Sequence, residues 1–225
     1  MTETTEVTMT VPAVRLSTAP EINRPDVHTV YMSHWFVDGA AQGRAVLDEI
    51  VDAWERSPWF EGVLSLSCYL STEHDTVLTY AQCANDDVYR PFLRSLPAGP
   101  ARTEPIAYRP HRSVVRDPAA GTPGTVALAS FDVDGAECQR RIVGTVVNHL
   151  ESAPAEDQEG LIAAHFHLSV DGTRVMNFAE WTSDEAHAAF LDGATRRRSL
   201  RLSLDTPGVR PIGFKRYHLH RSLGA

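Results

Sequence analysis

The segment VMNFAEW, residues 175–181, has the pattern of a β-strand and is followed at once by TSDEAHAAFLDG, residues 182–193. Because side chains alternate between the two faces of a strand, Asn177, Ala179 and Trp181 are predicted to share one face, with Phe178 on the other. Apolar groups occur on both faces, which indicates a strand covered on both sides. A buried amide needs a hydrogen-bonding partner, so Asn177 beside the indole of Trp181 predicts a pocket that binds a ligand.

The residues after this strand predict a helix. Thr182 and Glu185 have the spacing of a capping box, and Gly193 stands where a helix would end. A plainer interpretation of the strand stays open, in which Trp181 is a core anchor and Asn177 is a polar residue at a sheet edge.

An earlier part of the chain repeats this pattern. VDGA at residues 37–40 recurs at 133–136, a shift of 96 residues, and the apolar stripe of the following helix recurs with it, so that Trp54 stands opposite Leu150. Two extra residues then raise the shift to 98, which makes Thr79 and Cys83 the counterparts of Asn177 and Trp181. A hydroxyl and a thiol cannot replace an amide and an indole. We therefore expect the first repeat to be degenerate and the second to bear the site.

Each repeat has the order strand, helix, strand, strand, helix, strand. In the first repeat we predict strands at 28–37, 62–71, 75–83 and 104–112 and helices at 41–56 and 85–95. In the second we predict strands at 124–133, 160–170, 173–181 and 211–221 and helices at 137–152 and 183–193. This order predicts an α+β fold made of two tandem ferredoxin-like βαββαβ repeats with antiparallel sheets.

The domain boundaries follow from composition and from the repeat. Residues 1–26 are rich in Thr, Val and Pro and are expected to form an extended arm. Residues 27–115 form the first repeat, 116–124 a Pro/Gly-rich linker, and 125–225 the second repeat.

The composition suits a soluble globular protein and excludes several classes. The net charge of −8 leaves no basic excess for binding nucleic acid by neutralising phosphates. The three cysteines lack CxxC spacing and no apolar run could span a membrane, so we expect reduced thiols, a cytoplasmic location and no membrane association. The basic cluster of residues 196–198 with Arg201 is interpreted as a solvated helix end.

The βαββαβ order and the Asn-x-x-x-Trp strand that leads into a helix resemble the antibiotic biosynthesis monooxygenase family. The resemblance covers about residues 28–222 and implies a dimeric α/β barrel, here an intrachain pseudo-dimer, with a further homodimer left open. It also implies a cofactor-independent monooxygenase with dioxygen as co-substrate. The organic substrate would be a small phenolic aromatic polyketide, an anthrone or hydroquinone, which is oxidised to a quinone in antibiotic biosynthesis.

By motif position, the resemblance implies that Asn177 and Trp181 are catalytic, together with Arg201 after the following helix. Where that family has a Tyr six residues beyond the Trp, this chain has His187, which we expect to carry protons near neutral pH.

Three further side chains, His165, His167 and Phe178, are candidate substrate contacts, because the histidine strand is predicted beside the Asn177 strand.

The histidine pairs at 165–167 and 218–220 each put two imidazoles on one strand face, but no carboxylate completes a triad of ligands, so no metal site is predicted. No glycine-rich phosphate loop indicates a nucleotide cofactor.

Three alternative functions stay open on the same fold. A polyketide cyclase would use His165, His167 and His187 as acid and base groups and would need no oxygen. A haem-degrading enzyme would need a histidine ligand near position 191, which is Leu191 here. The third is a small-molecule-binding protein without catalytic activity.

Overall fold

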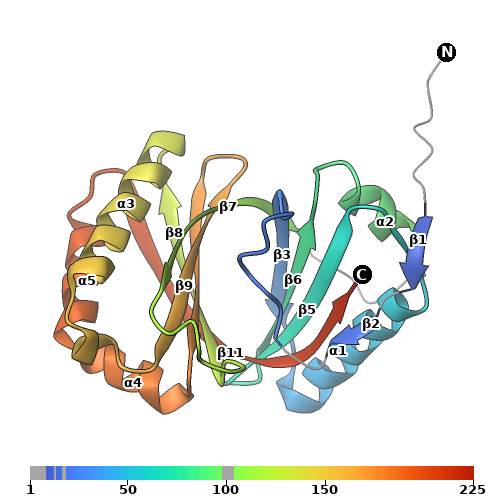
Figure 1. The fold of residues 1–225 in the computed structure, drawn as a ribbon, viewed down its shortest axis with the longest axis horizontal. Coiled ribbons are helices and arrows are strands. Elements are labelled where there is room, and N and C mark those ends of the chain that lie inside the picture. The colour runs from blue at the N-terminus through green and yellow to red at the C-terminus, as the bar shows by residue number, and fades with distance from the viewer. Residues whose placement is uncertain (1–8, 13, 17–18, 98–103) are drawn as a thin grey trace. The chain divides into compact units, whose positions relative to one another are not determined.

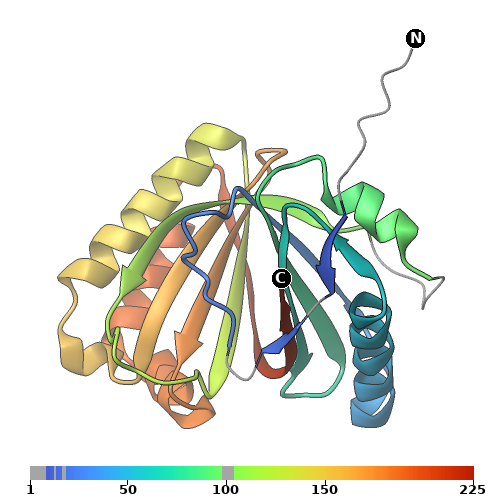
Figure 2. The same cartoon turned by 45° about the vertical axis from the view of Figure 1, so that its right-hand side comes forward.

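The protein is described by a computed structural model for residues 9–12, 14–16, 19–97 and 104–225. Its contacts divide the chain into two compact units. Unit 1 comprises the described residues up to Ile106 together with Leu219–Ala225, and unit 2 comprises Ala107–His218. In each unit, helices pack against antiparallel strands (Figures 1 and 2).

Unit 1 contains the first repeat from its first strand to its second helix, without the repeat's last strand. Its sheet has the order β2–β11–β5–β6–β3, where β11 contributes its C-terminal end. The elements are β2 (Val14–Leu16), β3 (Thr29–Phe36), α1 (Gly39–Glu55), β5 (Val63–Ser71), β6 (Thr76–Cys83), α2 (Tyr89–Ser95) and β11 (Val209–Gly224). Two short strands, β1 (Met9–Pro12) and β4 (Pro58–Phe60), pair with each other in a separate sheet.

Unit 2 contains most of the second repeat. Its sheet has the order β7–β9–β10–β8–β11, with antiparallel pairing throughout. The elements are β7 (Ile106–Val115), β8 (Thr125–Val133), α3 (Ala136–Ser152), the 3-10 helix η1 (Ala155–Gln158), β9 (Leu161–Ser169), β10 (Arg174–Trp181), α4 (Asp184–Asp192) and α5 (Ala194–Leu204). Helices α3, α4 and α5 all lie on one side of this sheet (Figure 1).

The predicted βαββαβ order of both repeats is confirmed, and the structure adds elements that were not predicted. The largest addition is α5, whose basic residues 196–198 had been interpreted as the solvated end of a helix. The predicted start of α4 was wrong by one residue, because the hydroxyl of Ser183, and not of Thr182, accepts a hydrogen bond from the amide of Ala186 at 3.2 Å. Gly193 ends α4 as predicted.

The last strand of the first repeat, and the end of the last strand of the second repeat, belong to the unit that holds most of the other repeat. Strand β7 pairs with β9 in unit 2, and Leu219–Ala225, which include the end of β11, belong to unit 1. Within unit 1, the Ser222 hydroxyl lies 2.8 Å from that of Ser67 on β5. The segment predicted to be a linker lies between β7 and β8.

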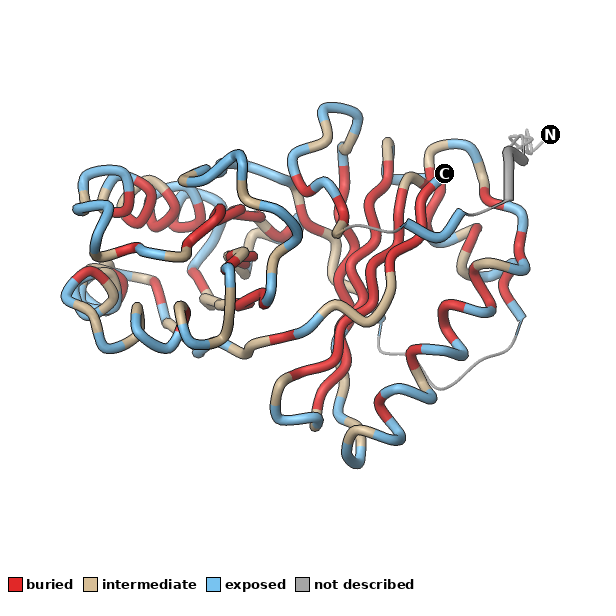
Figure 3. Tube along the Cα trace, turned by 60° about the horizontal axis from the view of Figure 1, so that its bottom comes forward, coloured by how far each residue is buried: buried red, intermediate tan, exposed pale blue. Residues whose placement is uncertain are grey.

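Apolar packing between helices and sheet makes the core of each unit. In unit 2 the core joins the apolar stripe of α3, which includes Ile142, Val143 and Val147, to Phe166 on β9 and Trp181 on β10. Along the helices, buried residues alternate with exposed ones, as expected for elements that pack one face against a sheet (Figure 3). No helix among the described residues has the length and apolar character needed to cross a membrane.

Candidate functional site

Unit 2 contains a cavity of about 280 Å³ between its sheet and its three helices. Most of the lining is apolar, with small side chains on the sheet side and larger ones from the helices and β11; examples are Ala127, Ala164, Val146, Leu150, Phe190 and Phe214. A pocket of this kind with a few polar groups is the usual setting for binding a small organic ligand.

Strand β10 delivers Asn177 and Trp181 to the cavity wall, as its alternation predicted. Trp181 is 2% exposed. Among the described residues, neither the Asn177 Oδ1 nor the Trp181 Nε1 has a hydrogen-bond partner, although both atoms are buried. A buried polar atom without a partner costs about 1–3 kcal/mol, so these two atoms are explained best by a ligand that bonds to them.

A β-bulge next to Trp181 shapes this wall. Strands β9 and β10 pair regularly from Val175 to Glu180, and the register then shifts by one residue so that Trp181 faces Leu161. Both Leu161 and Ala164 consequently line the cavity. Bulges are common beside functional sites because they redirect a side chain without ending the strand.

His187 on α4 forms the end of the cavity nearest the indole. Its ring centroid lies 5.1 Å from that of Trp181 and 5.1 Å from that of Phe214, which meets it edge-on at 85°. Its Nδ1 is buried and has no partner within the described chain. Burial, reinforced by the positive charge of Arg216, lowers the pKa of His187 to about 4. The imidazole is therefore neutral at pH 7, and its titration falls below the near-neutral range expected from the sequence.

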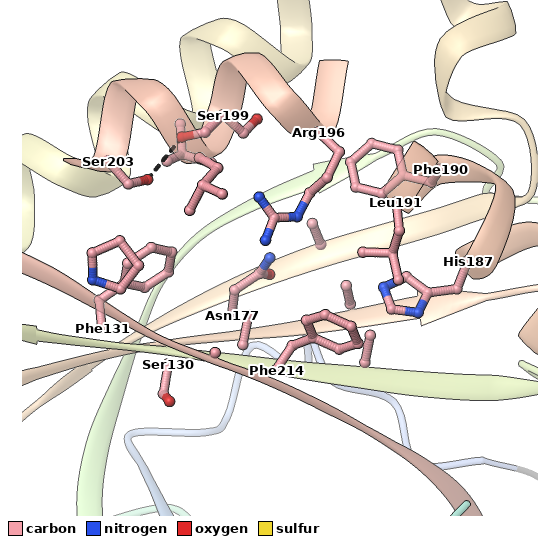
Figure 4. A pocket seen from close by; sticks show the side chains of 18 of the residues that line it. Ser130, Phe131, Asn177, His187, Phe190, Leu191, Arg196, Ser199, Ser203 and Phe214 are labelled. Carbon is pink, nitrogen blue, oxygen red and sulfur yellow. Dashed lines mark hydrogen bonds between the residues drawn. The ribbon is translucent and has the colours of Figure 1, made fainter. Parts of the chain in front are cut away.

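Helix α5 covers the cavity and supplies a cation. Arg196, Ser199, Leu200 and Ser203 line the cavity at the i, i+3, i+4 and i+7 spacing of one helix face. The guanidinium of Arg196 points from α5 toward Asn177 (Figure 4). Desolvation lowers the pKa of Arg196, which nevertheless stays charged. No Asp or Glu is among the described residues that line the cavity, so this charge faces the space without a carboxylate beside it.

Arg201, the cation predicted from the resemblance, is not in this cavity. It lies five residues, about 1.4 helical turns, beyond Arg196 on α5 and is exposed to solvent. Of the basic cluster it is Arg196 that lines the cavity, and this placement was missed because the cluster was interpreted as solvated and helix α5 was not predicted.

His165, His167 and Phe178 are buried, but they do not line the cavity. The prediction that the histidine strand lies beside β10 is confirmed, since Phe178 pairs with His165 and Met176 pairs with His167. These pairs occupy the face of the sheet opposite to Asn177, which itself pairs with Phe166. The prediction that these three side chains contact a ligand therefore does not hold for this cavity.

The two histidines have their own hydrogen bonds on that opposite face. His165 lies 2.9 Å from the Ser113 hydroxyl and 3.1 Å from the Glu180 carboxylate, and His167 Nδ1 donates to the carbonyl of His165 at 3.1 Å. Burial lowers the pKa of His167 to about 3, so it is neutral at physiological pH. Within the described ranges, no group of three His, Cys, Asp or Glu side chains is arranged to hold a metal ion.

The comparisons with known proteins establish the fold. No protein-family model matches the sequence, and no curated protein matches it. An anthrone oxidase-like protein of known structure matches with a TM-score of 0.62 and 13% identity, covering 94% of this chain and 95% of that chain. A ferredoxin-fold protein related to antibiotic biosynthesis monooxygenases, from Listeria monocytogenes, matches with a TM-score of 0.52 and 9% identity, covering 86% of this chain and 94% of that chain.

A monooxygenase-like protein from Listeria innocua also matches, with a TM-score of 0.50 and 10% identity over 86% of this chain and 94% of that chain. At these identities the likeness concerns the fold alone. The chain has the α+β fold of dimeric α/β-barrel proteins, with tandem ferredoxin-like repeats, and its structural neighbours are proteins related to monooxygenases and anthrone oxidases, as the resemblance predicted.

Proposed function

We propose that the protein is a cofactor-independent monooxygenase that oxidises a phenolic polycyclic aromatic compound, such as an anthrone or hydroquinone, to a quinone with dioxygen as co-substrate. The cavity of unit 2 would be its active site. The fold similarity to an anthrone oxidase-like protein supports this reaction class.

One observation carries the proposal. Buried polar atoms of Asn177, Trp181 and His187 converge on one apolar cavity, and in the described part of the chain none of the three has a partner. A half-buried guanidinium, that of Arg196, faces the same space. Such a set suits a flat, mainly apolar molecule that becomes an anion during the reaction.

The first step in this site would be removal of a proton from the substrate by His187. Its neutral imidazole can accept the proton, and the imidazolium that forms would stand beside the new substrate anion. That ion pair offsets the desolvation that keeps the imidazole neutral in the empty cavity. Arg196 and the Asn177 amide would hold the anionic oxygen, and the indole of Trp181 would stack on or hydrogen-bond to the ring system.

The second step would join the substrate to oxygen. The electron-rich anion transfers one electron to dioxygen, and the resulting radical pair combines to form a carbon–oxygen bond. The proton held by His187 converts the peroxide anion to a hydroperoxide, which loses water to give the carbonyl. In sum, one CH₂ group of an anthrone and one O₂ become one C=O and one H₂O, so the substrate supplies all the electrons.

The test is oxygen consumption by the purified protein with anthrone and no added cofactor. We expect one O₂ to be consumed for each quinone formed, and Arg196→Gln to slow the reaction strongly. The matched control is Arg201→Gln, which changes an exposed arginine on the same helix and should leave the rate unchanged. Equal losses in the two variants, or no oxygen uptake at all, would refute the proposal. Conversion of a poly-ketone under argon would identify a cyclase instead.

A further inference from the structure

We propose that Ser199 on α5 is a specificity-determining residue, and that it selects aromatic ligands carrying a hydroxyl or carbonyl group at the end of the ring system remote from His187. The expectation that the ligand is aromatic rests on the proposed function. The expectation that Ser199 selects a polar group on that ligand rests on where Ser199 lies and on the absence of a hydrogen-bond partner for its hydroxyl among the described residues.

Helix α5 is an addition to the second repeat. Between the first helix of each repeat and α4 the two repeats are related by a shift of 98 residues, as in Thr79 and Asn177, but their last strands are related by a shift of 109, as in Tyr108 and Tyr217. The difference equals the 11 residues of Ala194–Leu204. Because the inserted helix contributes one whole face to the cavity, its polar side chains are features that the repeat itself does not require.

The two serines on this face differ in their hydrogen bonding. Ser203 Oγ donates to the backbone carbonyl of Ser199 at 2.9 Å, which is the usual way for a helical serine to bond to the preceding turn. The Ser199 Oγ is buried and has no partner among the described residues. The carbonyl that it would use in the same manner, that of Thr195, accepts from His149 Nε2 at 3.1 Å. Ser199 thus lines the cavity and carries a hydroxyl that no described residue satisfies, and a polar group of a bound ligand would satisfy it.

The location of Ser199 defines which part of a ligand it would contact. In Figure 4, Ser199 and Ser203 lie at one end of the cavity and His187 at the other, with Arg196 and Asn177 between them. A substrate that places its reacting carbon at His187 and its anionic oxygen at Arg196 would extend its next substituent toward Ser199. Of the hydroxylated anthrones, those with hydroxyl groups flanking the ring carbonyl fit this order.

The experiment measures binding under argon, where no oxidation can occur. The probes are anthrone and 1,8-dihydroxyanthrone, titrated calorimetrically into the wild-type protein, Ser199→Ala and Ser203→Ala. We expect the wild type to prefer the dihydroxy compound by roughly 5- to 30-fold in Kd, the effect of one or two kcal/mol of hydrogen bonding. Ser199→Ala should lose this preference, whereas Ser203→Ala, whose hydroxyl already has a partner, should keep it.

Each outcome decides the inference. A preference that survives in Ser199→Ala, or that disappears equally in both variants, would overturn it, as would failure of both probes to bind. Selective binding without oxygen uptake in air would refute the proposed oxygenase function and leave the role of Ser199 intact. Oxygen uptake without a preference that depends on Ser199 would refute the role of Ser199 and leave the proposed oxygenase function intact.

Discussion

Unit 1 has a cavity of about 30 Å³ where unit 2 has one of about 280 Å³, although both units place an amphipathic helix over the corresponding strands. Besides the additional helix α5 of unit 2, side-chain size differs at several matching positions that line the two cavities. Trp54 and Tyr89 of unit 1 correspond to Leu150 and His187 of unit 2. Tyr89 stacks on Tyr31 with ring centroids 4.0 Å apart, and the counterpart of Tyr31 is an alanine.

Hydrogen bonding separates the two units as clearly as volume does. In unit 1 the indole nitrogen of Trp59 donates to the carbonyl of Trp54 at 3.1 Å, so that this buried donor is satisfied within the protein. In unit 2 the indole nitrogen of Trp181 has no partner in the described chain. The aromatic groups of unit 1 therefore serve stability, whereas unit 2 keeps empty space and unpaired polar atoms, which reduce stability and favour a ligand.

The strongest test of this comparison removes the polar side chain at the matching position of each unit in turn, the amide of Asn177 and the hydroxyl of Thr79. We expect Asn177→Ala to lower the rate of oxygen consumption with anthrone by about 10²–10³-fold, the effect of losing one group that stabilises an anionic transition state. Thr79→Ala, the matching change in unit 1, should leave the rate within about twofold, as expected for a change that does not contact the transition state. A comparable loss in both variants would mean that unit 1 also takes part in catalysis.

Opening unit 1 should weaken the fold rather than the reaction. Trp54 is 1% exposed and contacts Trp59, Tyr89 and Phe92. We expect Trp54→Leu to lower the free energy of unfolding by about 2–4 kcal/mol, since large-to-small core changes lose contacts and leave a void. Urea denaturation gives this value, and oxygen uptake by the folded variant should be unchanged. An unaltered unfolding midpoint would show that unit 1 is not tightly packed around Trp54.

Filling the cavity of unit 2 should weaken ligand binding and leave the fold intact. Leu150→Trp copies the unit 1 side chain into the cavity wall. We expect anthrone to bind about tenfold or more weakly under argon, because forcing a large side chain into space that a ligand needs costs roughly 1–3 kcal/mol. Circular dichroism serves as the control for folding. Unchanged affinity in a folded Leu150→Trp protein would place the ligand outside this cavity.

The smallest expected effect concerns pH. The folded pKa of His187 is about 4, below its usual value near 6.5, so a catalytic role as a base predicts a rate that is flat between about pH 5 and 8 and falls as the pH drops through 4. His187→Gln should lower the rate and remove this acid limb. Its counterpart in unit 1 is Tyr89. Persistence of the limb in His187→Gln would assign it to another group.

The same shift predicts a change in stability. Because burial lowers the pKa of His187 in the folded state, the unfolded chain binds a proton first as the pH falls below about 6.5, and the wild-type protein loses stability between about pH 6.5 and 4. His187→Gln should lose less over this range in urea melts. His167, with a pKa of about 3, adds to the loss in both proteins, so the difference between them isolates His187.

Alternation along one strand was enough to predict the wall of the site. It placed Asn177 and Trp181 on one face and Phe178 on the other, and the structure agrees. The histidines of β9 were misplaced because neighbouring strands were predicted without their register. A shift by a single residue exchanges the two faces, so the face of His165 depends on its pairing with Phe178.

Arg196 and Ser199 were missed for a different reason. Three of the four α5 residues that line the cavity are polar, so the helix lacks the apolar stripe that periodicity detects, and three consecutive arginines suggest a solvated surface. The available signal was the repeat itself. The shift between the copies grows by 11 residues after α4, which is the length of one three-turn helix.

Because β7 and the end of β11 each belong to the unit that holds most of the other repeat, they limit how one repeat can be replaced by that of a related protein. A cut at the linker that starts with Arg116 separates the two repeats of the sequence, but it takes β7 away from its partner β9 and deprives unit 1 of Leu219–Ala225. Swapping one repeat for that of another protein would therefore replace a strand in both units. A single repeat is therefore not an interchangeable module, and we expect recombination to be tolerated best where the boundaries follow the units, near Ile106 and Leu219.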